Sequence, residues 1–568
     1  MIQKLTDRKY GRVYTPELLS RYIAKKTIQY AFADPKFTTM NHISVIDPAI
    51  GDGQLLKSFN KQLKNIQNVN FYGIDVDSKA IKNCNKNFNN ESISLLKTNS
   101  LIPNSKMTLN DGWKKIFQIF NKGKKFDLLI ANPPWGADIS KYVHKLNKND
   151  FQTLQKGVDT FELFIELATK IVRKDGYFSF IVPDSILNDG KEVIKNILTS
   201  NTELKFISRL GEKMFPGINR ACVIIICKNT KFNSESYIDC FRLTSEDKKK
   251  ILDGTMTLSE SEKLHSHKIP QSRFLNNFHN HFDIDLKENE TKVLQKIKNS
   301  NLLGDYLSST RGVELGISGK VCKCNSCELW SPLSEKNEVI CSNCSNKIIK
   351  NESEQFTIIS SKKIPNSVPI ITGKNLKRYV CKPTNWIKLG YDGIGYKSKS
   401  TYDSPKILIR KTGVGITAGL DYSSSYTTQV VYILKNRDKN NPDLEFFLSL
   451  LNSRLYYFFL AKSFGEIEWR SHPYLTQTQI KNLPLPDLES NENKKIIKQI
   501  TKKLKFALSK GKLSKRVDLE IELMIGKLFS LDKNDYKIIF DSINESQELL
   551  PIKELKNFQL YEIQNKMK

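Results

Sequence analysis

The stretch FDLLIANPPWGADIS, residues 126–140, decides the fold of the first part of the chain. Its apolar run from Leu128 to Ala131 is typical of a strand that is buried within a parallel sheet. Two prolines then end the strand, because proline has no N–H to donate to a neighbouring strand. The strand therefore ends by presenting an amide, Asn132, and a large aromatic side chain, Trp135. One interpretation is a loop that is merely rich in proline, and the other is a pocket for a flat, polar ring.

Short apolar strands alternate with helical patterns through residues 1–240. Further strand candidates are HISVIDP, NFYGIDV, GYFSFIVP, KFISRL and ACVIIICK, and helical patterns such as FELFIELATKIVRK lie between them. This alternation predicts an α/β fold with a doubly wound, Rossmann-like sheet.

The composition changes three times after this region. Residues 241–300 are polar and charged, and we expect them to form a connector. Residues 301–485 are rich in Gly, Thr, Tyr and Ser and contain short strands, which predicts a mixed α+β domain. Residues 486–568 are rich in lysine and have a helical pattern, so a C-terminal helical region is expected.

The chain is strongly basic. Its 568 residues include 89 Lys+Arg and 60 Asp+Glu, a formal net charge of +29. Such a surplus favours a polyanionic partner such as nucleic acid, although lysine is abundant throughout this chain. The N-terminus has no apolar signal segment, and the longest apolar stretches are short or interrupted, so we expect no membrane association. Ten cysteines without a secretion signal favour a cytoplasmic location, where thiols stay reduced.

Acidic residues end two more of the predicted strands. Asp47 precedes the glycine-containing turn PAIGDG, in which Gly51 would allow a ligand to approach the backbone closely. Asp75 ends the strand NFYGIDV, where its carboxylate could accept hydrogen bonds from both hydroxyls of a ribose. The turn lacks the Gly-Lys-Ser/Thr ending of a phosphate-binding loop. Each acid alone could be a helix N-cap, but together they indicate a nucleoside without a phosphate.

The Asn-Pro-Pro-Trp segment offers two hydrogen-bond acceptors and an aromatic face. The side-chain carbonyl of Asn132 is a hydrogen-bond acceptor, and the main-chain carbonyl of Pro133 has no strand partner. Two acceptors can take both hydrogens of an exocyclic NH₂ group, and Trp135 offers a face on which a base can stack.

These motifs resemble a known enzyme family. DPAIGDG, GIDVD, NPPW and the early GRVYTPELLSRYI resemble the gamma subgroup of the S-adenosylmethionine-dependent adenine-N6 DNA methyltransferases. Residues 301–485 resemble, more loosely, the TaqI-like domain that recognises the target sequence. The resemblance implies an enzyme of a restriction-modification system. Such an enzyme would transfer a methyl group from S-adenosylmethionine to an adenine flipped out of double-stranded DNA.

The resemblance also implies roles for single residues. The residues expected to bind the cofactor are Tyr14, Thr15, Pro16, Asp47, Ala49, Gly51, Asp75, Val76 and Asn99. The residues expected to act on the target adenine are Asn132, Pro133, Pro134 and Trp135, with Phe215 stacking on the base opposite Trp135. Asn99 departs from the family, which usually has an aspartate there to accept from the adenine amino group of the cofactor. The side-chain carbonyl of Asn99 can still accept, so we expect cofactor binding to be retained.

Four cysteines in the predicted recognition domain have metal-ligand spacing. Within VCKCNSCELWSPLSEKNEVICSNCSNK, Cys324 and Cys327 form one Cys-x-x-Cys pair, and Cys341 and Cys344 form another. Two such pairs in a short segment predict a zinc ribbon at residues 322–344, with a structural zinc that has no open coordination position. Cys322 could replace Cys324 as a ligand, although the spacing favours Cys324.

Other functions are compatible with parts of this pattern. An Asn-Pro-Pro-aromatic motif could also hold an amine or amide of RNA or protein. The methyltransferase fold could instead be a DNA-binding subunit of a restriction complex. The long basic region after residue 300 favours DNA. We recognise no nuclease motif, so any accompanying restriction endonuclease is expected to be a separate protein.

Overall fold

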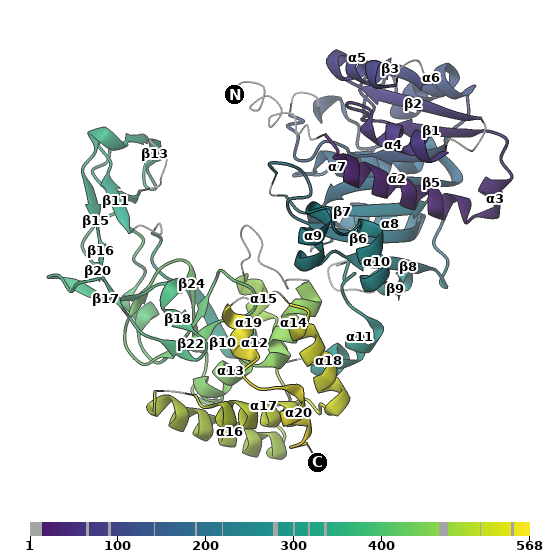
Figure 1. Ribbon diagram of the computed structural model, residues 1–568. Coiled ribbons are helices and arrows are strands. Elements are labelled where there is room, and N and C mark those ends of the chain that lie inside the picture. Colours follow the sequence, from purple (N-terminus) through teal and green to yellow (C-terminus); the bar gives the residue numbers. More distant parts are fainter. Residues whose placement is uncertain are drawn as a thin grey trace. The chain divides into compact units, whose positions relative to one another are not determined.

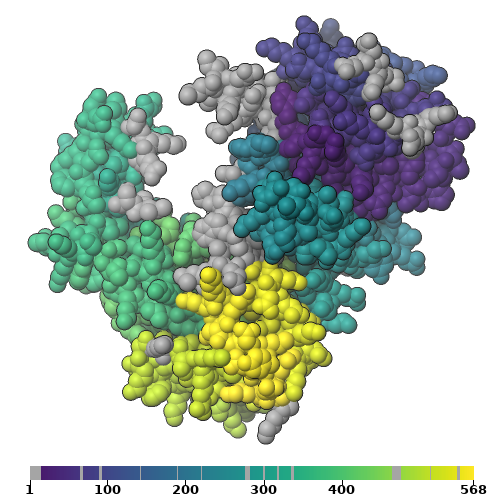
Figure 2. Space-filling model, in the orientation of Figure 1, coloured from purple at the N-terminus to yellow at the C-terminus, as the bar shows by residue number. Residues whose placement is uncertain are grey.

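The structure is a computed structural model of the chain. It describes residues 14–63, 68–88, 93–140, 143–187, 190–218, 220–275, 282–298, 301–315, 319–333, 338–464, 475–511, 513–546 and 550–567. The chain forms two compact units, residues 1–287 and residues 288–568. Figure 1 labels their elements, and Figure 2 colours the first unit from purple to teal and the second from teal-green to yellow.

A nine-stranded sheet forms the centre of the first unit, in the order β3-β2-β1-β4-β5-β7-β6-β8-β9. The strands are β1 Ile43–Asp47, β2 Val69–Asp75, β3 Ile93–Lys97, β4 Phe126–Ala131, β5 Val172–Pro183, β6 Glu203–Gly211, β7 Cys222–Lys228, β8 Tyr237–Arg242 and β9 His267–Pro270. The neighbours from β3 to β5 are parallel, whereas β7 is antiparallel to both β5 and β6. The chain changes direction across the sheet between β1 and β4, and in such sheets ligands bind at this switch point.

Helices connect these strands and cover the sheet. They are α2 Glu17–Phe32, α3 Pro35–Thr38, α4 Gln54–Leu63, α5 Ser78–Asn87, α6 Leu109–Asn121, α7 Thr160–Ile171, α8 Glu192–Asn201, α9 Ser245–Leu252 and α10 Leu258–His265. Right-handed crossovers place α4 and α5 on one face of the sheet, and α6 and α7 on the other. The doubly wound α/β fold predicted from the sequence is therefore confirmed.

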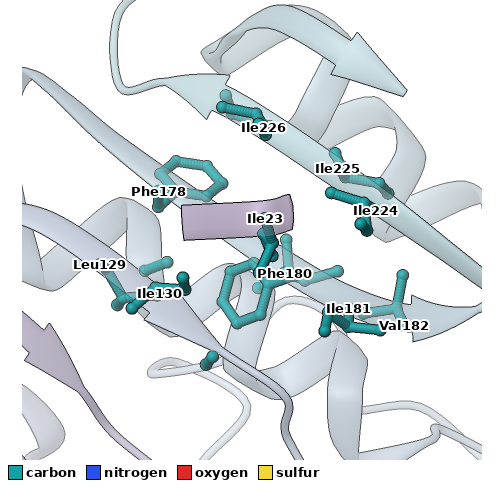
Figure 3. Close-up of a cluster of buried hydrophobic side chains, with 14 of the residues drawn as sticks. Ile23, Leu129, Ile130, Phe178, Phe180, Ile181, Val182, Ile224, Ile225 and Ile226 are labelled. Atoms are coloured by element: carbon teal, nitrogen blue, oxygen red, sulfur yellow. The ribbon is translucent and has the colours of Figure 1, made fainter. Parts of the chain in front are cut away.

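The apolar strands form the core of this unit. All residues of β1 and β4 are buried, as predicted for strands covered on both faces. Figure 3 shows Ile23 of α2 among side chains of β4, β5 and β7. The strand β3 was not among the predicted strands. It has only partly buried and exposed residues, so its apolar pattern is weak.

The second unit is a mixed α+β structure with several small sheets. One contains β10 Leu307–Arg311, β24 Val431–Asn436, β21 Lys406–Arg410 and β22 Ala418–Asp421. Another contains β16 Ile359–Ser360, β20 Asn385–Lys388, β17 Ser367–Ile371 and β23 Tyr426–Thr427. A two-stranded sheet pairs β18 Leu376–Lys377 with β19 Val380–Cys381. These short strands confirm the predicted α+β character of the second part of the chain.

A separate ribbon interrupts this unit. It consists of a sheet of β12 Trp330–Pro332, β11 Lys320–Lys323 and β15 Gln355–Thr357, and of the hairpin β13 Glu338–Ile340 with β14 Lys347–Ile349. The small core of the ribbon contains mainly cysteines and a few aliphatic residues, so it buries little apolar surface.

Helices complete the second unit. They are α11 Glu288–Ile297, α12 Leu303–Tyr306, α13 Leu444–Leu451, α14 Arg454–Phe464, α15 Gln477–Lys481, α16 Asn491–Ser509, α17 Lys515–Leu528, α18 Lys533–Asn544, α19 Leu550–Leu555 and α20 Leu560–Gln564. Asp518 of α17 pairs with Arg378 at 2.7 Å and with Arg454 at 3.2 Å, and all three side chains are buried. These ion pairs tie the C-terminal helices to the strands and to α14, within one compact unit.

The unit boundary differs from the domain boundaries expected from the sequence. Within the segment 241–300, expected as a connector, α9, α10 and β9 belong to the first unit, and α11 belongs to the second. The short strand β9 extends the large sheet by pairing with β8.

No described helix is long and apolar enough to cross a membrane.

Candidate active site

A cavity of about 200 Å³ lies at the carboxyl ends of the parallel strands. The segments that follow β1, β2, β3 and β4 all contribute to its walls, which is the arrangement expected at the switch point of an open sheet. The predicted site residues that line it are Tyr14, Ala49, Gly51, Asp75, Val76, Asn99, Asn132 and Pro134. The predicted residues that do not line it are Thr15, Pro16, Asp47, Pro133, Trp135 and Phe215.

The turn after β1 is held by the carboxylate at the end of β2. Asp75 Oδ2 accepts a hydrogen bond from the Gly51 backbone N–H at 3.0 Å, and Oδ1 accepts one from the Asp77 N–H at 2.8 Å. Gly53 is required in this turn for two reasons. Its φ is +82°, and a Cβ on it would lie 2.6 Å from the sulfur of Cys84. The turn therefore brings its backbone and Asp75 to the same wall of the cavity.

Asp47 stabilises the turn after β1 with a hydrogen bond to its backbone. It is 1% exposed, and its Oδ1 accepts a hydrogen bond from the Ala49 N–H at 2.9 Å. Burial raises the pKa of Asp47 well above its usual value, and the nearby carboxylates of Asp75 and Asp52 act in the same direction. Asp47 thus shapes the turn, while Ala49 and Gly51 face the cavity.

The segment after β3 contributes Asn99 to the cavity wall, and the Asn99 side chain already makes one hydrogen bond. Its Oδ1 accepts a hydrogen bond from the Leu101 N–H at 2.9 Å. A carbonyl oxygen has two lone pairs, so Oδ1 keeps capacity for a second donor. Tyr14 and Val76 are 53% and 58% exposed and belong to the open side of the cavity.

Asn132 is oriented by the segment before α2. Its Nδ2 donates to Thr15 Oγ1 at 3.1 Å. Thr15 therefore helps to orient the side-chain amide of Asn132. The next residue, Pro16, is the N-cap of α2. An amide nitrogen only donates, so the carbonyl oxygen is the group that Asn132 can offer as an acceptor to a substrate amine.

Trp135 and Phe215 lie against each other. Their ring centroids are 5.2 Å apart at an interplanar angle of 85°, and the two side chains are 6% and 1% exposed. A ring held face to face between two others needs about 7 Å between them, twice the carbon contact distance. The stacking arrangement expected from the sequence, with a base between Trp135 and Phe215, therefore needs these two rings to separate.

Helix α7 contributes two cavity residues that the sequence analysis missed, Thr160 and Phe164. Thr160 is 1% exposed, and its hydroxyl has no hydrogen-bond partner among the described residues. A buried hydroxyl without a partner is unfavourable, so this group is available to a ligand in the cavity. The helical pattern FELFIELATKIVRK predicted the helix, but not that its first turn faces the cavity.

The four cysteines of the ribbon form a compact cluster. The sulfur atoms of Cys324, Cys327, Cys341 and Cys344 all lie within 4.8 Å of one another. Two of these distances, Cys324–Cys344 and Cys327–Cys341, are 3.7 Å. A tetrahedral zinc site with Zn–S bonds of ~2.3 Å has S–S distances of about 3.8 Å. The cluster therefore has the size of a Cys₄ metal site.

Cys322 lies outside the cluster. Its thiol is buried and contacts the backbone oxygen of Ser331 at 3.7 Å. The structure therefore brings Cys324, and not Cys322, together with the other three thiols. All ten cysteines lie within the described residues, and none forms a disulfide.

Comparison with known families agrees with the fold. The fold of the first unit is that of Rossmann-like methyltransferases. The profile of the N-6 DNA Methylase family matches residues 2–283, and that of the TaqI-like C-terminal specificity domain matches residues 368–485. Together the two matches cover most of the chain. The chain belongs to the N-6 DNA methylase family and carries a TaqI-like specificity domain, as predicted.

Similar proteins include type II methyltransferases. M.BanIII of Aneurinibacillus aneurinilyticus is 30% identical over 223 residues, which are 38% of this chain and 37% of that protein. A type II methyltransferase of Thermus thermophilus is 26% identical over 232 residues, 39% of this chain and 45% of that protein. The matched parts thus span less than half the length of these relatives. Among solved structures, the Type IIL restriction-modification enzyme MmeI has a TM-score of 0.52 at 12% identity, covering 98% of this chain and 78% of that one.

Proposed function

We propose that this chain is a site-specific DNA methyltransferase that transfers a methyl group from S-adenosylmethionine to the N6 amino group of a flipped adenine in double-stranded DNA. The observation that supports this most directly is the position of Asn132 in the same cavity as Asp75 and the Gly51 turn. The candidate acceptor for a substrate amine and the candidate ribose ligand thus share one cavity. A nucleoside and an amine could meet there.

The cavity residues fit S-adenosylmethionine. This cofactor is cationic and, when bound, supplies an electrophilic methyl group on its sulfonium sulfur. Asp75 offers carboxylate oxygens beside the Gly51 turn, and the buried hydroxyl of Thr160 lacks a described partner. The carboxylate of Asp75 in the cavity wall suits a cation. We assign cofactor binding to Tyr14, Ala49, Gly51, Asp75, Val76, Asn99 and Thr160.

Replacing Asp75 by alanine should weaken cofactor binding. Hydrogen bonds to a charged group contribute about 1.5–3 kcal/mol, so the dissociation constant should rise between about 10-fold and 100-fold. Calorimetric titration with S-adenosylmethionine measures this change. The control is Asp111→Ala, because Asp111 is an exposed carboxylate in the first turn of α6 that pairs with Lys114. Equal affinity of the two variants would remove Asp75 from the site.

Replacing Thr160 by valine should weaken cofactor binding without lowering the stability of the free protein. Valine keeps the shape but removes a buried hydroxyl that lacks a described partner, so the free protein should be as stable as the wild type or more stable. The variant should bind the cofactor about 5-fold more weakly, corresponding to one lost hydrogen bond. Thermal unfolding and calorimetric titration give the two quantities. Thr160→Ser keeps the hydroxyl and serves as the control; undiminished affinity in the valine variant would contradict the assignment.

The residues of the Asn-Pro-Pro-Trp segment act on the substrate amine. An exocyclic amine is a poor nucleophile because its lone pair is delocalised into the ring. Two hydrogen bonds, to Asn132 Oδ1 and to the Pro133 carbonyl, would favour a tetrahedral nitrogen with a localised lone pair. Pro134 restricts the backbone there, and Trp135 and Phe215 would hold the base by stacking. Catalysis then comes mainly from positioning.

The second unit would recognise the DNA sequence. It carries the specificity domain, and the chain as a whole has a net charge of +29, which favours binding to phosphates. Arg410 and Lys411 precede a glycine-containing turn after β21 and could contact a DNA groove. We further propose that Cys324, Cys327, Cys341 and Cys344 bind one structural zinc that folds the ribbon. Any cognate endonuclease would be a separate partner.

Sequencing of modified bases tests the proposed function. The chain should be expressed in a host that lacks adenine methylation, beside the Asn132→Ala variant as the matched control. We expect N6-methyladenine at one sequence motif in the wild-type sample and none in the control sample. Unmodified DNA in both samples, with folded protein present, would contradict the proposal and leave a DNA-binding subunit, or an RNA or protein methyltransferase, as the function.

A further inference from the structure

The carboxylate of Asp159, which does not line the cavity, holds the loop that carries Asn132 and Trp135. Asp159, the residue before α7, accepts a hydrogen bond at Oδ1 from the backbone N–H of Gly136, at 2.8 Å. Its other oxygen, Oδ2, lies 3.3 Å from Nη2 of Arg220. Neither Asp159 nor Arg220 lines the cavity, and the proposed function assigns no role to either.

Arg220 in turn contacts the aromatic ring of the loop. Its guanidinium carbon is 5.7 Å from the centre of the Trp135 ring, a cation–π contact. It also packs closely on the backbone, because a Cβ on Gly136 would lie 3.3 Å from Nη1 of Arg220. The Arg220 side chain is 41% exposed, whereas that of Asp159 is 15% exposed. The more buried Asp159 therefore restrains the flexible end of the more exposed Arg220.

Trp135 is restrained on other sides as well. Its Nε1 donates to the Ile181 backbone oxygen of β5 at 3.3 Å, and its ring touches Phe215. A base can stack between Trp135 and Phe215 only if the two rings separate. Trp135 is held by Ile181, by Arg220 and through Gly136 by Asp159, and these restraints favour movement of Phe215 over movement of Trp135.

We propose that Asp159 and Arg220 are positioning residues for methyl transfer. Asp159 fixes the backbone after Trp135 and aims the guanidinium of Arg220, and Arg220 fixes the Trp135 ring. Asn132 and Trp135 thereby keep their places while the target base enters and Phe215 moves away. This inference rests on the proposed function, because it assigns the loop to the reacting base.

Three variants separate the two contacts. Asp159→Ala removes both the bond to Gly136 and the pairing with Arg220. Asp159→Asn keeps an oxygen that can accept from Gly136 but loses the charge. Arg220→Ala removes the contact with Trp135 and the pairing with Asp159, but keeps the bond from Gly136 to Asp159. A misplacement of about 1 Å in an active site can lower a rate by about 100-fold. We expect about that loss in single-turnover methyl transfer for Asp159→Ala, about 10-fold losses for the other two, and wild-type cofactor affinity in all three.

Asp111→Ala is the matched control, because it removes an exposed carboxylate from the start of another helix of the same unit. If Asp159→Ala transfers methyl groups as fast as this control, the inference is wrong. It is also wrong if the rate loss is matched by an equal loss of cofactor affinity, or if Asp159→Asn is no more active than Asp159→Ala. Failure of the wild type itself to methylate DNA would instead refute the proposed function.

The fluorescence of Trp135 tests the inference even if the wild type does not methylate DNA. The fluorescence of Trp135 is obtained by subtracting the spectrum of a Trp135→Phe variant from that of the same protein with Trp135 intact. In Asp159→Ala and Arg220→Ala backgrounds, Trp135 should be more accessible to quenching by acrylamide than in the wild type. Unchanged quenching in both backgrounds would show that these residues do not position Trp135.

Discussion

Replacing Asn132 by alanine is expected to lower the rate of methyl transfer by about 1000-fold or more while leaving cofactor affinity unchanged. The expected loss is large because the Asn132 carbonyl is one of the two acceptors proposed for the substrate amine. The cofactor is proposed to contact Asp75 and the Gly51 turn instead, and these residues keep their own hydrogen bonds in the variant. Single-turnover kinetics measures the rate, and calorimetric titration measures the affinity.

Two further variants make this result specific. Asn132→Asp keeps an oxygen acceptor and should retain more activity than Asn132→Ala. Asn201→Ala replaces an exposed asparagine at the end of α8 and should behave as the wild type. A loss of less than about 10-fold in Asn132→Ala, equivalent to about 1.4 kcal/mol, would exclude Asn132 as the main acceptor.

Removal of the metal is expected to abolish specific DNA binding and to spare cofactor binding. The ribbon has a small core in which cysteines are prominent, so metal binding has to supply much of its folding free energy. The double substitution Cys341→Ser and Cys344→Ser removes two of four ligands and should have the same effect as a chelator. The cofactor cavity lies in the first unit and contains none of these residues.

Cys322→Ser is the matched control for the metal site. Cys322 lies in the same ribbon and is buried, but its sulfur is outside the cluster. Elemental analysis should find about one zinc per chain in the wild type and in Cys322→Ser, and less than half of that in the double variant. The assignment fails if the wild type purified without added metal contains less than half an equivalent of zinc and its thiols react freely.

The local pattern of the sequence was sufficient to predict the sheet and the positions of its polar strand ends. A run such as Leu128–Ala131 is apolar because both faces of β4 are covered, and this requirement is visible in any chain that contains such a strand. Asp47, Asp75 and Asn132 each follow such a run, and parallel strands bring their carboxyl ends to one edge. The same reasoning could not detect β3, whose residues are half-exposed.

The cysteine spacing likewise predicted the cluster of four thiols, because a Cys-x-x-Cys turn brings two thiols together locally. The tertiary structure decided that Cys324, and not Cys322, joins the cluster. Cys322 lies within β11, where the strand pairs with β12, and its sulfur contacts Ser331.

Only the tertiary structure decided the contacts between residues that are distant in the chain. The sequence does not show that Thr160 faces the cavity, that Asp159 holds Gly136, or that Trp135 and Phe215 touch. The physical reason is that burial and turn chemistry act on each segment separately and leave a periodic pattern. Contacts between segments depend on strand order and on the crossovers that pack each helix against the sheet, and these are fixed only when the whole unit folds.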